Sequence, residues 1–163
     1  MKPVVVLSSL IPMSIALLAG AVVPFQAASN AALGKALGHP LWSTLTSLTV
    51  SVLVVLPLLW IMRVPMPNFS IALKGPLWLW FGGIAGVAYI TAALILTPKI
   101  GVANFMVSVV AGQMLASLFI DHAGIMGLEA RPVSWERLIG VALIVIGMLF
   151  VQMSNILVSM NNK

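Results

Sequence analysis

Five long apolar segments without a single charged residue constrain what this chain can fold into. Each contains roughly 20 residues, enough for a helix to cross about 30 Å of hydrocarbon at about 1.5 Å per residue. Because lipid offers no hydrogen bonds to an open backbone, each segment must be a helix. The sequence therefore predicts an all-α, polytopic membrane protein, a bundle of five transmembrane helices. The predicted segments are Val4–Phe25, Leu41–Met62, Leu77–Thr97, Ile100–Ile120 and Leu138–Met160.

Composition excludes several other classes of protein. Of the 163 residues, 61% are hydrophobic and only 7% are charged, whereas a soluble domain carries roughly a quarter charged residues. The length suits one transmembrane domain covering residues 1–163. The net charge of +5 comes from basic residues scattered singly, which does not indicate a nucleic-acid partner. The partner that this composition indicates is the lipid bilayer.

The polar breaks predict how the helices are joined. The connection Thr97-Pro98-Lys99 is so short that the helices on either side should be antiparallel neighbours. Ser134 is the expected N-cap of the last helix. Prolines are tolerated inside membrane helices, so the first helix can continue past Pro24 through Asn30. That first segment is longer than the core of a signal peptide, and we expect it to be retained.

Basic residues favour one orientation by a small margin. A cytoplasmic N-terminus is favoured under the positive-inside rule, because it places more basic residues inside. The margin is small enough to leave insertion in both orientations open. The inside would hold Lys2, Arg63, Lys74, Arg131 and Arg137, and the outside Lys35, Lys99 and Lys163.

No catalytic or metal-binding pattern is present in the sequence. The chain has no cysteine, and its two histidines, His39 and His122, lie at predicted membrane boundaries outside any H-E-x-x-H pattern. A phosphate-binding Walker motif is also absent. The sequence thus predicts neither an enzyme nor a bound metal or cofactor.

Uncharged polar residues within the apolar segments are the candidates for a solute site. Gln26 and Asn30 are four residues apart and share a helix face. Asn104 and Gln113 are about half a turn out of phase, so they point in two directions. An amide left in lipid costs several kcal/mol, which means that these side chains must face other helices or a wet cavity. We predict Gln26, Asn30, Tyr89, Asn104 and Gln113 as substrate-binding residues, with a purely structural role as the open alternative.

Two further pairs of residues carry predictions. Gly82 and Gly86 form a small-xxx-small pattern that lets two helices approach closely. No carboxylate precedes Asp121, so Asp121 and His122 are the candidates for proton coupling in the first four helices. Their position at a helix end favours the alternative, in which they are simply solvated at the membrane interface.

Several segments together resemble the YdcZ-like family of the EamA-related drug/metabolite transporter (DMT) superfamily. The resemblance lies in Phe25–Gly34, Trp80–Gly86, Gly101–Ala103, Ala111–Gln113, Ile120–Gly127 and Gly140, in that order along the chain. One departure is Leu53–Leu56, where the family usually has a glycine. The resemblance implies a half-size unit of five helices, which is one half of an inverted-repeat transporter. Two copies, or one copy and a paired five-helix partner, would rebuild the ten-helix architecture.

The predicted function is transport of a small polar or amphipathic metabolite across the bacterial inner membrane, by alternating access in a dimer. The open alternative is a non-transporting accessory subunit or assembly partner of a heteromeric membrane complex.

Overall fold

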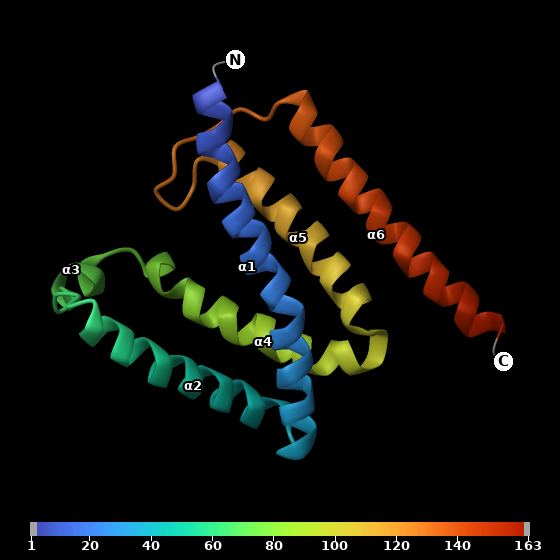
Figure 1. Cartoon of the computed structure of the whole chain (residues 1–163), viewed down its shortest axis with the longest axis horizontal. Helices are drawn as coiled ribbons and strands as arrows, with labels where there is room; N and C mark the ends of the chain where they lie inside the picture. The colour runs from blue at the N-terminus through green and yellow to red at the C-terminus, as the bar shows by residue number, and fades with distance from the viewer. Residues whose placement is uncertain (1–2, 162–163) are drawn as a thin grey trace.

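Five long helices make up the protein in a computed structural model, which describes residues 3–161 and the side-chain surroundings of residues 10–154 (Figure 1). Lys2 and Lys163, counted in the charge bias, lie outside the described residues. All five long helices are apolar enough to span a membrane, and no strand occurs between residues 3 and 161. The predicted all-α membrane class is therefore confirmed. The elements are α1 (Pro3–Ala36), α2 (Pro40–Ile61), α3 (Phe69–Lys74), the 3-10 turn η1 (Leu77–Trp80), α4 (Phe81–Ile100), α5 (Val102–Ala123) and α6 (Trp135–Asn161).

The first helix continues well beyond its apolar segment. It contains Pro12 and Pro24 and ends at Ala36 instead of Phe25, because the residues after Pro24 are rich in alanine, the best helix former. The chain then turns at Gly38, whose φ of 79° suits glycine. His39 begins α2 as its N-cap, with its Nδ1 accepting a hydrogen bond from the Leu41 amide at 3.2 Å.

The break between α4 and α5 lies at a different residue from the one predicted. The helix continues through Thr97 and Pro98 to Ile100 and stops at Gly101. Gly101 has a φ of 84°, a conformation that glycine adopts without steric cost, so glycine decides where the chain turns. The two helices are in contact, as expected of neighbours, and α5 turns back from the end of α4 (Figure 1).

The buried core is small and lies where α1 meets α4 and α5. Its apolar members are Ala27, Ala31, Ile90, Ala93, Leu94 and Phe105. Alanines at this crossing let the helix backbones approach closely. The helix α2 joins the core only through its first turns, where Ser43 and Thr44 are buried, and all of its residues from Thr49 onward are exposed. The helix α6 packs chiefly on α5.

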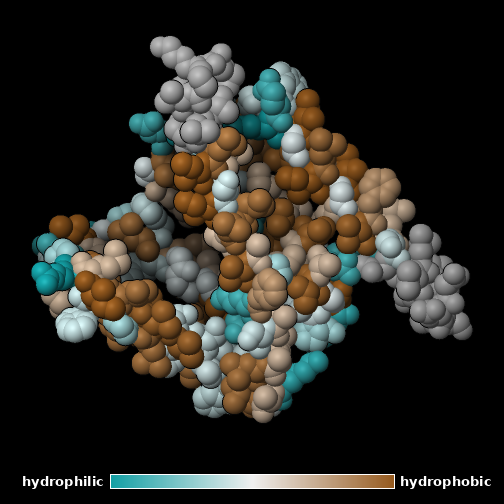
Figure 2. Space-filling view, in the orientation of Figure 1, coloured by the Kyte–Doolittle hydropathy of each residue, from teal (hydrophilic) through white to brown (hydrophobic). Residues whose placement is uncertain are grey.

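Most of the large apolar side chains face outward. Figure 2 shows hydrophobic residues over much of the visible surface. Such a surface would be an aggregation hazard in water, but lipid tails solvate it well. The outer face of the bundle is thus the face of a membrane protein.

The linker between α5 and α6 is folded back onto the end of α5. Gly124 caps α5 in the left-handed conformation, with φ of 58°, and the Arg131 amide donates to the Asp121 carbonyl at 2.7 Å. The helix α6 begins at Trp135, and Ser134 Oγ accepts from the Arg137 amide at 3.4 Å. The predicted N-cap at Ser134 is confirmed.

Candidate functional site

A small cavity, mostly apolar but with three polar residues on its wall and called the polar cavity below, lies at the crossing of α1 and α4. It is lined by Gln26 and Asn30 from α1 and by Tyr89 from α4, together with the apolar Val23, Ala27, Ile90 and Ala93. Three of the predicted substrate-binding residues therefore meet at one place. The cavity has a volume of about 10 Å³, which is room for roughly one water molecule.

Local sequence explains why these side chains meet. Gln26 and Asn30 are one helical turn apart, and Ala27 between them is buried against Ala93 of α4, so the two amides flank the point of closest approach. Ser43 of α2 is fully buried and donates from its Oγ to the Asn30 carbonyl at 2.8 Å. That hydrogen bond ties the start of α2 to the cavity wall. Gln26 is the exposed member of the group.

Tyr89 contributes to the cavity a buried hydroxyl without a hydrogen-bond partner in the described residues. Its ring lies 6.1 Å from the ring of Phe105 on α5, tilted by 35°, so the side chain is held in place by aromatic packing. Its hydroxyl is buried and has no hydrogen-bond partner among the described residues. A buried hydroxyl without a partner costs about 1–3 kcal/mol, and a water or a solute in the cavity can supply that partner.

Asn104 lies elsewhere, on the side of α5 that faces α6. Its Nδ2 donates to the backbone carbonyl of Ile100, the last residue of α4, at 2.6 Å. Gln152 of α6 donates from its Nε2 to the Asn104 carbonyl at 3.4 Å and to Ser108 Oγ at 2.9 Å. These are contacts between helices, and the structure does not bring Asn104 to the polar cavity. Gln152 is not among the residues predicted from the sequence. The signal that could have identified it is an amide near the middle of the last apolar segment.

Gln113 is exposed on α5 and does not line the polar cavity. Gly82 and Gly86 do not pack against another helix in the described residues, because a Cβ added at either glycine would meet nothing within 4 Å. A packing role for these glycines against a second chain stays a prediction. Among the described residues, that face of α4 has no side chain close enough to touch an added Cβ.

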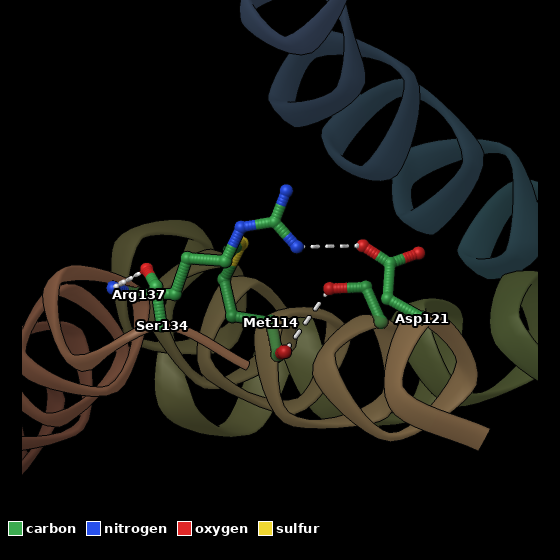
Figure 3. A network of polar contacts seen from close by, with 5 residues as sticks. Met114, Asp121, Ser134 and Arg137 are labelled. Atoms are coloured by element: carbon green, nitrogen blue, oxygen red, sulfur yellow. Dashed lines mark hydrogen bonds and ion pairs between the residues drawn. The ribbon is translucent and has the colours of Figure 1, made fainter. Parts of the chain in front are cut away.

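The two candidates for proton coupling lie at the far end of α5. Asp121 forms an ion pair with Arg137 of α6, with Oδ2 and Nη1 3.3 Å apart (Figure 3). His122 is exposed beside it. Asp121 is 16 residues from Phe105, or about 24 Å along the helix axis, so neither residue adjoins the polar cavity. Arg137 as the partner of Asp121 was not predicted.

Comparison with known proteins adds one finding. A family model described as "Putative inner membrane exporter, YdcZ" matches residues 11–150. That range includes every residue of the polar cavity. No curated protein and no solved structure gives a significant match to the chain.

Proposed function

Since the chain belongs to the YdcZ family of the drug/metabolite transporter superfamily, whose members are described as inner-membrane exporters, we propose that it carries a small polar or amphipathic metabolite by alternating access. The family is one of transporters, not of enzymes. The protein is accordingly a multi-pass protein of the bacterial inner membrane. Substrate class, mechanism and partner chain are the parts that this proposal adds.

The observation that carries the proposal is the unpartnered Tyr89 hydroxyl beside two amides in one cavity. Gln26, Asn30 and Tyr89 offer both donors and acceptors but no charge, a set suited to the hydroxyl, carbonyl or amine groups of a polar solute. Each buried polar group that finds a partner only in the solute adds selectivity for it. The site thus favours a polar or amphipathic metabolite over a bare ion.

Cavity size supports a closed state in an alternating-access cycle. A space of about 10 Å³ holds no metabolite, so α1 and α4 must separate for a solute to enter. Their contact is built on alanines, the aliphatic Ile90 and Leu94 and the Tyr89 ring, without an ion pair between them in the described residues. Such a contact can open without breaking buried charges.

A second copy would complete the unit. The outer half of α2 and the amides Gln26 and Gln113 are exposed, and among the described residues a Cβ on the glycine face of α4 would meet nothing within 4 Å. An amide facing lipid is costly, and a five-helix partner of opposite orientation would cover these surfaces in the manner of inverted-repeat transporters. We therefore propose a homodimer, or a pair with another five-helix chain, with the N-terminus of one copy in the cytoplasm.

Transport in proteoliposomes tests the solute site. A panel of polar metabolites is loaded, and release from vesicles with the protein is compared with release from empty vesicles. We expect Asn30→Ala and Gln26→Leu to abolish most of the protein-dependent flux, whereas Asn68→Ala, an exposed change before α3, should keep it. Equal flux for Asn30→Ala and the wild type would refute the site. Flux that appears only with a co-expressed second five-helix chain would favour the pair over the homodimer, and no flux in either case would favour the non-transporting accessory subunit.

Energy coupling through Asp121 or His122 is tested in the same vesicles. If either group carries the coupling proton, Asp121→Asn or His122→Gln removes the dependence of flux on an imposed pH gradient. Retained dependence in both variants would assign Asp121 to the ion pair with Arg137 alone. Reporter fusions at both termini determine whether one orientation or both occur.

A further inference from the structure

A second cavity lies between α5 and α6, away from Gln26, Asn30 and Tyr89. Its volume is about 360 Å³, and its walls are mostly apolar, formed by Met114, Leu118, Val141 and Ile144. Asp121 and Arg137 also line it. These two residues lie in the last turn of α5 and the first turn of α6, so the charged end of the cavity is at the membrane boundary and the apolar part lies deeper.

The ion pair at this end leaves hydrogen-bonding groups of both side chains without a partner in the described residues. Arg137 Nη1 and Asp121 Oδ2 are 3.3 Å apart, and the two side chains are 44% and 39% exposed. A guanidinium has five N–H donors, and in the described residues one of its nitrogens contacts a side chain. The second carboxylate oxygen of Asp121 also has no hydrogen-bond partner in that part of the chain. The pair therefore offers free donors and a free acceptor side by side (Figure 3).

We propose that this cavity binds a phospholipid with a zwitterionic amine head group, phosphatidylethanolamine. Its phosphate would accept hydrogen bonds from Arg137, since guanidinium and phosphate match in geometry. Its ammonium would donate to the free oxygen of Asp121, and one acyl chain would lie against Leu118 and Ile144. Basic side chains in pockets between membrane helices are known to bind the phosphates of lipid head groups.

Charge complementarity selects this lipid over others. Asp121 and Arg137 together carry no net charge, which matches a zwitterion and leaves the extra negative charge of phosphatidylglycerol unmatched. Phosphatidylcholine is also a zwitterion, but its quaternary ammonium has no N–H to donate to Asp121. Trp135, exposed at the start of α6, is the kind of residue that lies at head-group level.

Gly140 keeps the cavity open. It lines the cavity, and a Cβ added to it would meet nothing within 4 Å, so a larger side chain there would extend into the space that the acyl chain needs. Gly147, two turns further along α6, also has nothing within 4 Å of an added Cβ but does not line the cavity. The two glycines form a matched pair for a test. The binding site is independent of which solute the protein carries.

Native mass spectrometry of the purified full-length protein tests the proposal. The protein is mixed with equal amounts of phosphatidylethanolamine, phosphatidylcholine and phosphatidylglycerol of the same acyl chains. We expect phosphatidylethanolamine to be retained about tenfold more than either competitor, the ratio expected for one hydrogen bond to a charged group. Equal retention of all three lipids would overturn the proposal.

Three variants test whether the retained lipid lies in this cavity. Gly140→Leu should lose most of the bound phosphatidylethanolamine with the ion pair intact, whereas Gly147→Leu should bind it as the wild type does. Arg137→Gln should reduce retention about tenfold. If Arg137→Gln does not fold, Gly140→Leu still decides the question. Wild-type binding by Gly140→Leu, or equal losses in both leucine variants, would contradict the site.

Discussion

Removing the Tyr89 hydroxyl should make the protein more stable and at the same time a poorer transporter. The hydroxyl is buried without a partner among the described residues, a situation that costs about 1–3 kcal/mol. Tyr89→Phe removes that cost and keeps the ring, including its contact with Phe105 at 6.1 Å. The adjoining cavity has room for roughly one water, which would return part of the cost. We therefore expect a gain of about 1 kcal/mol, at the lower end of the range.

Ser43→Ala is the matched control, because it deletes a buried hydroxyl that does have a partner. Ser43 is 0% exposed, and its Oγ donates to the Asn30 carbonyl at 2.8 Å. Losing a satisfied hydrogen bond costs about 1 kcal/mol. Deleting the hydroxyl should therefore raise the free energy of unfolding at Tyr89 and lower it at Ser43.

Thermal unfolding of the purified proteins in one detergent measures the difference. A change of 1 kcal/mol shifts the midpoint by roughly 2–4 °C for a chain of this size, so Tyr89→Phe should melt a few degrees above the wild type and Ser43→Ala a few degrees below. A lower midpoint for Tyr89→Phe would refute the reasoning about the unpartnered hydroxyl. In proteoliposomes, wild-type flux for Tyr89→Phe would remove Tyr89 from the solute site.

Two other predictions concern stability and use the same thermal assay. Gly124→Ala should destabilise the protein by at least about 1–2 kcal/mol, the cost of a left-handed non-glycine residue, and the added Cβ would also lie 2.9 Å from the Ala130 amide nitrogen. Gly147→Ala, with open space around the added Cβ, should cause no loss of stability. Equal midpoints for the two variants would contradict this prediction. Gln152→Leu should lower stability by about 0.6 kcal/mol, the average for a hydrogen bond between membrane helices, because it removes the bonds to Asn104 and Ser108. The exposed Gln113→Leu should not lower stability, and a loss equal to that of Gln152→Leu would show that Gln113 has a partner.

Several local features of the fold could be read from the sequence because they depend on short-range chemistry. The five spans follow from apolar length, and the N-cap at Ser134 follows from a serine placed just before the last helix. The break predicted at Thr97–Lys99 was misplaced because a proline in a membrane helix does not have to end it. Gly101, with its positive φ, ends α4 instead.

The candidate site could be predicted only in part. Gln26 and Asn30 were recognised as one face because a helix brings residues i and i+4 together, but their meeting with Tyr89 depends on how α1 and α4 are rotated about their axes. The partner of Asn104 could not be predicted either, since its interaction with Gln152 joins residues 48 positions apart. A polar residue indicates that a partner is needed, without indicating which helix supplies it.

The sequence by itself determined that this chain spans a membrane with five helices, because a backbone in lipid must satisfy its own hydrogen bonds. The tertiary structure decided which polar side chains share a cavity and which join helices. The physical reason lies in the solvent. In water, an apolar stripe would mark the buried face of each helix, but these helices are apolar on nearly all sides, since lipid accepts the outer face as readily as the core does. Packing of small residues such as Ala27 against Ala93 sets the rotation of the helices instead, and with it the place where Gln26, Asn30 and Tyr89 meet.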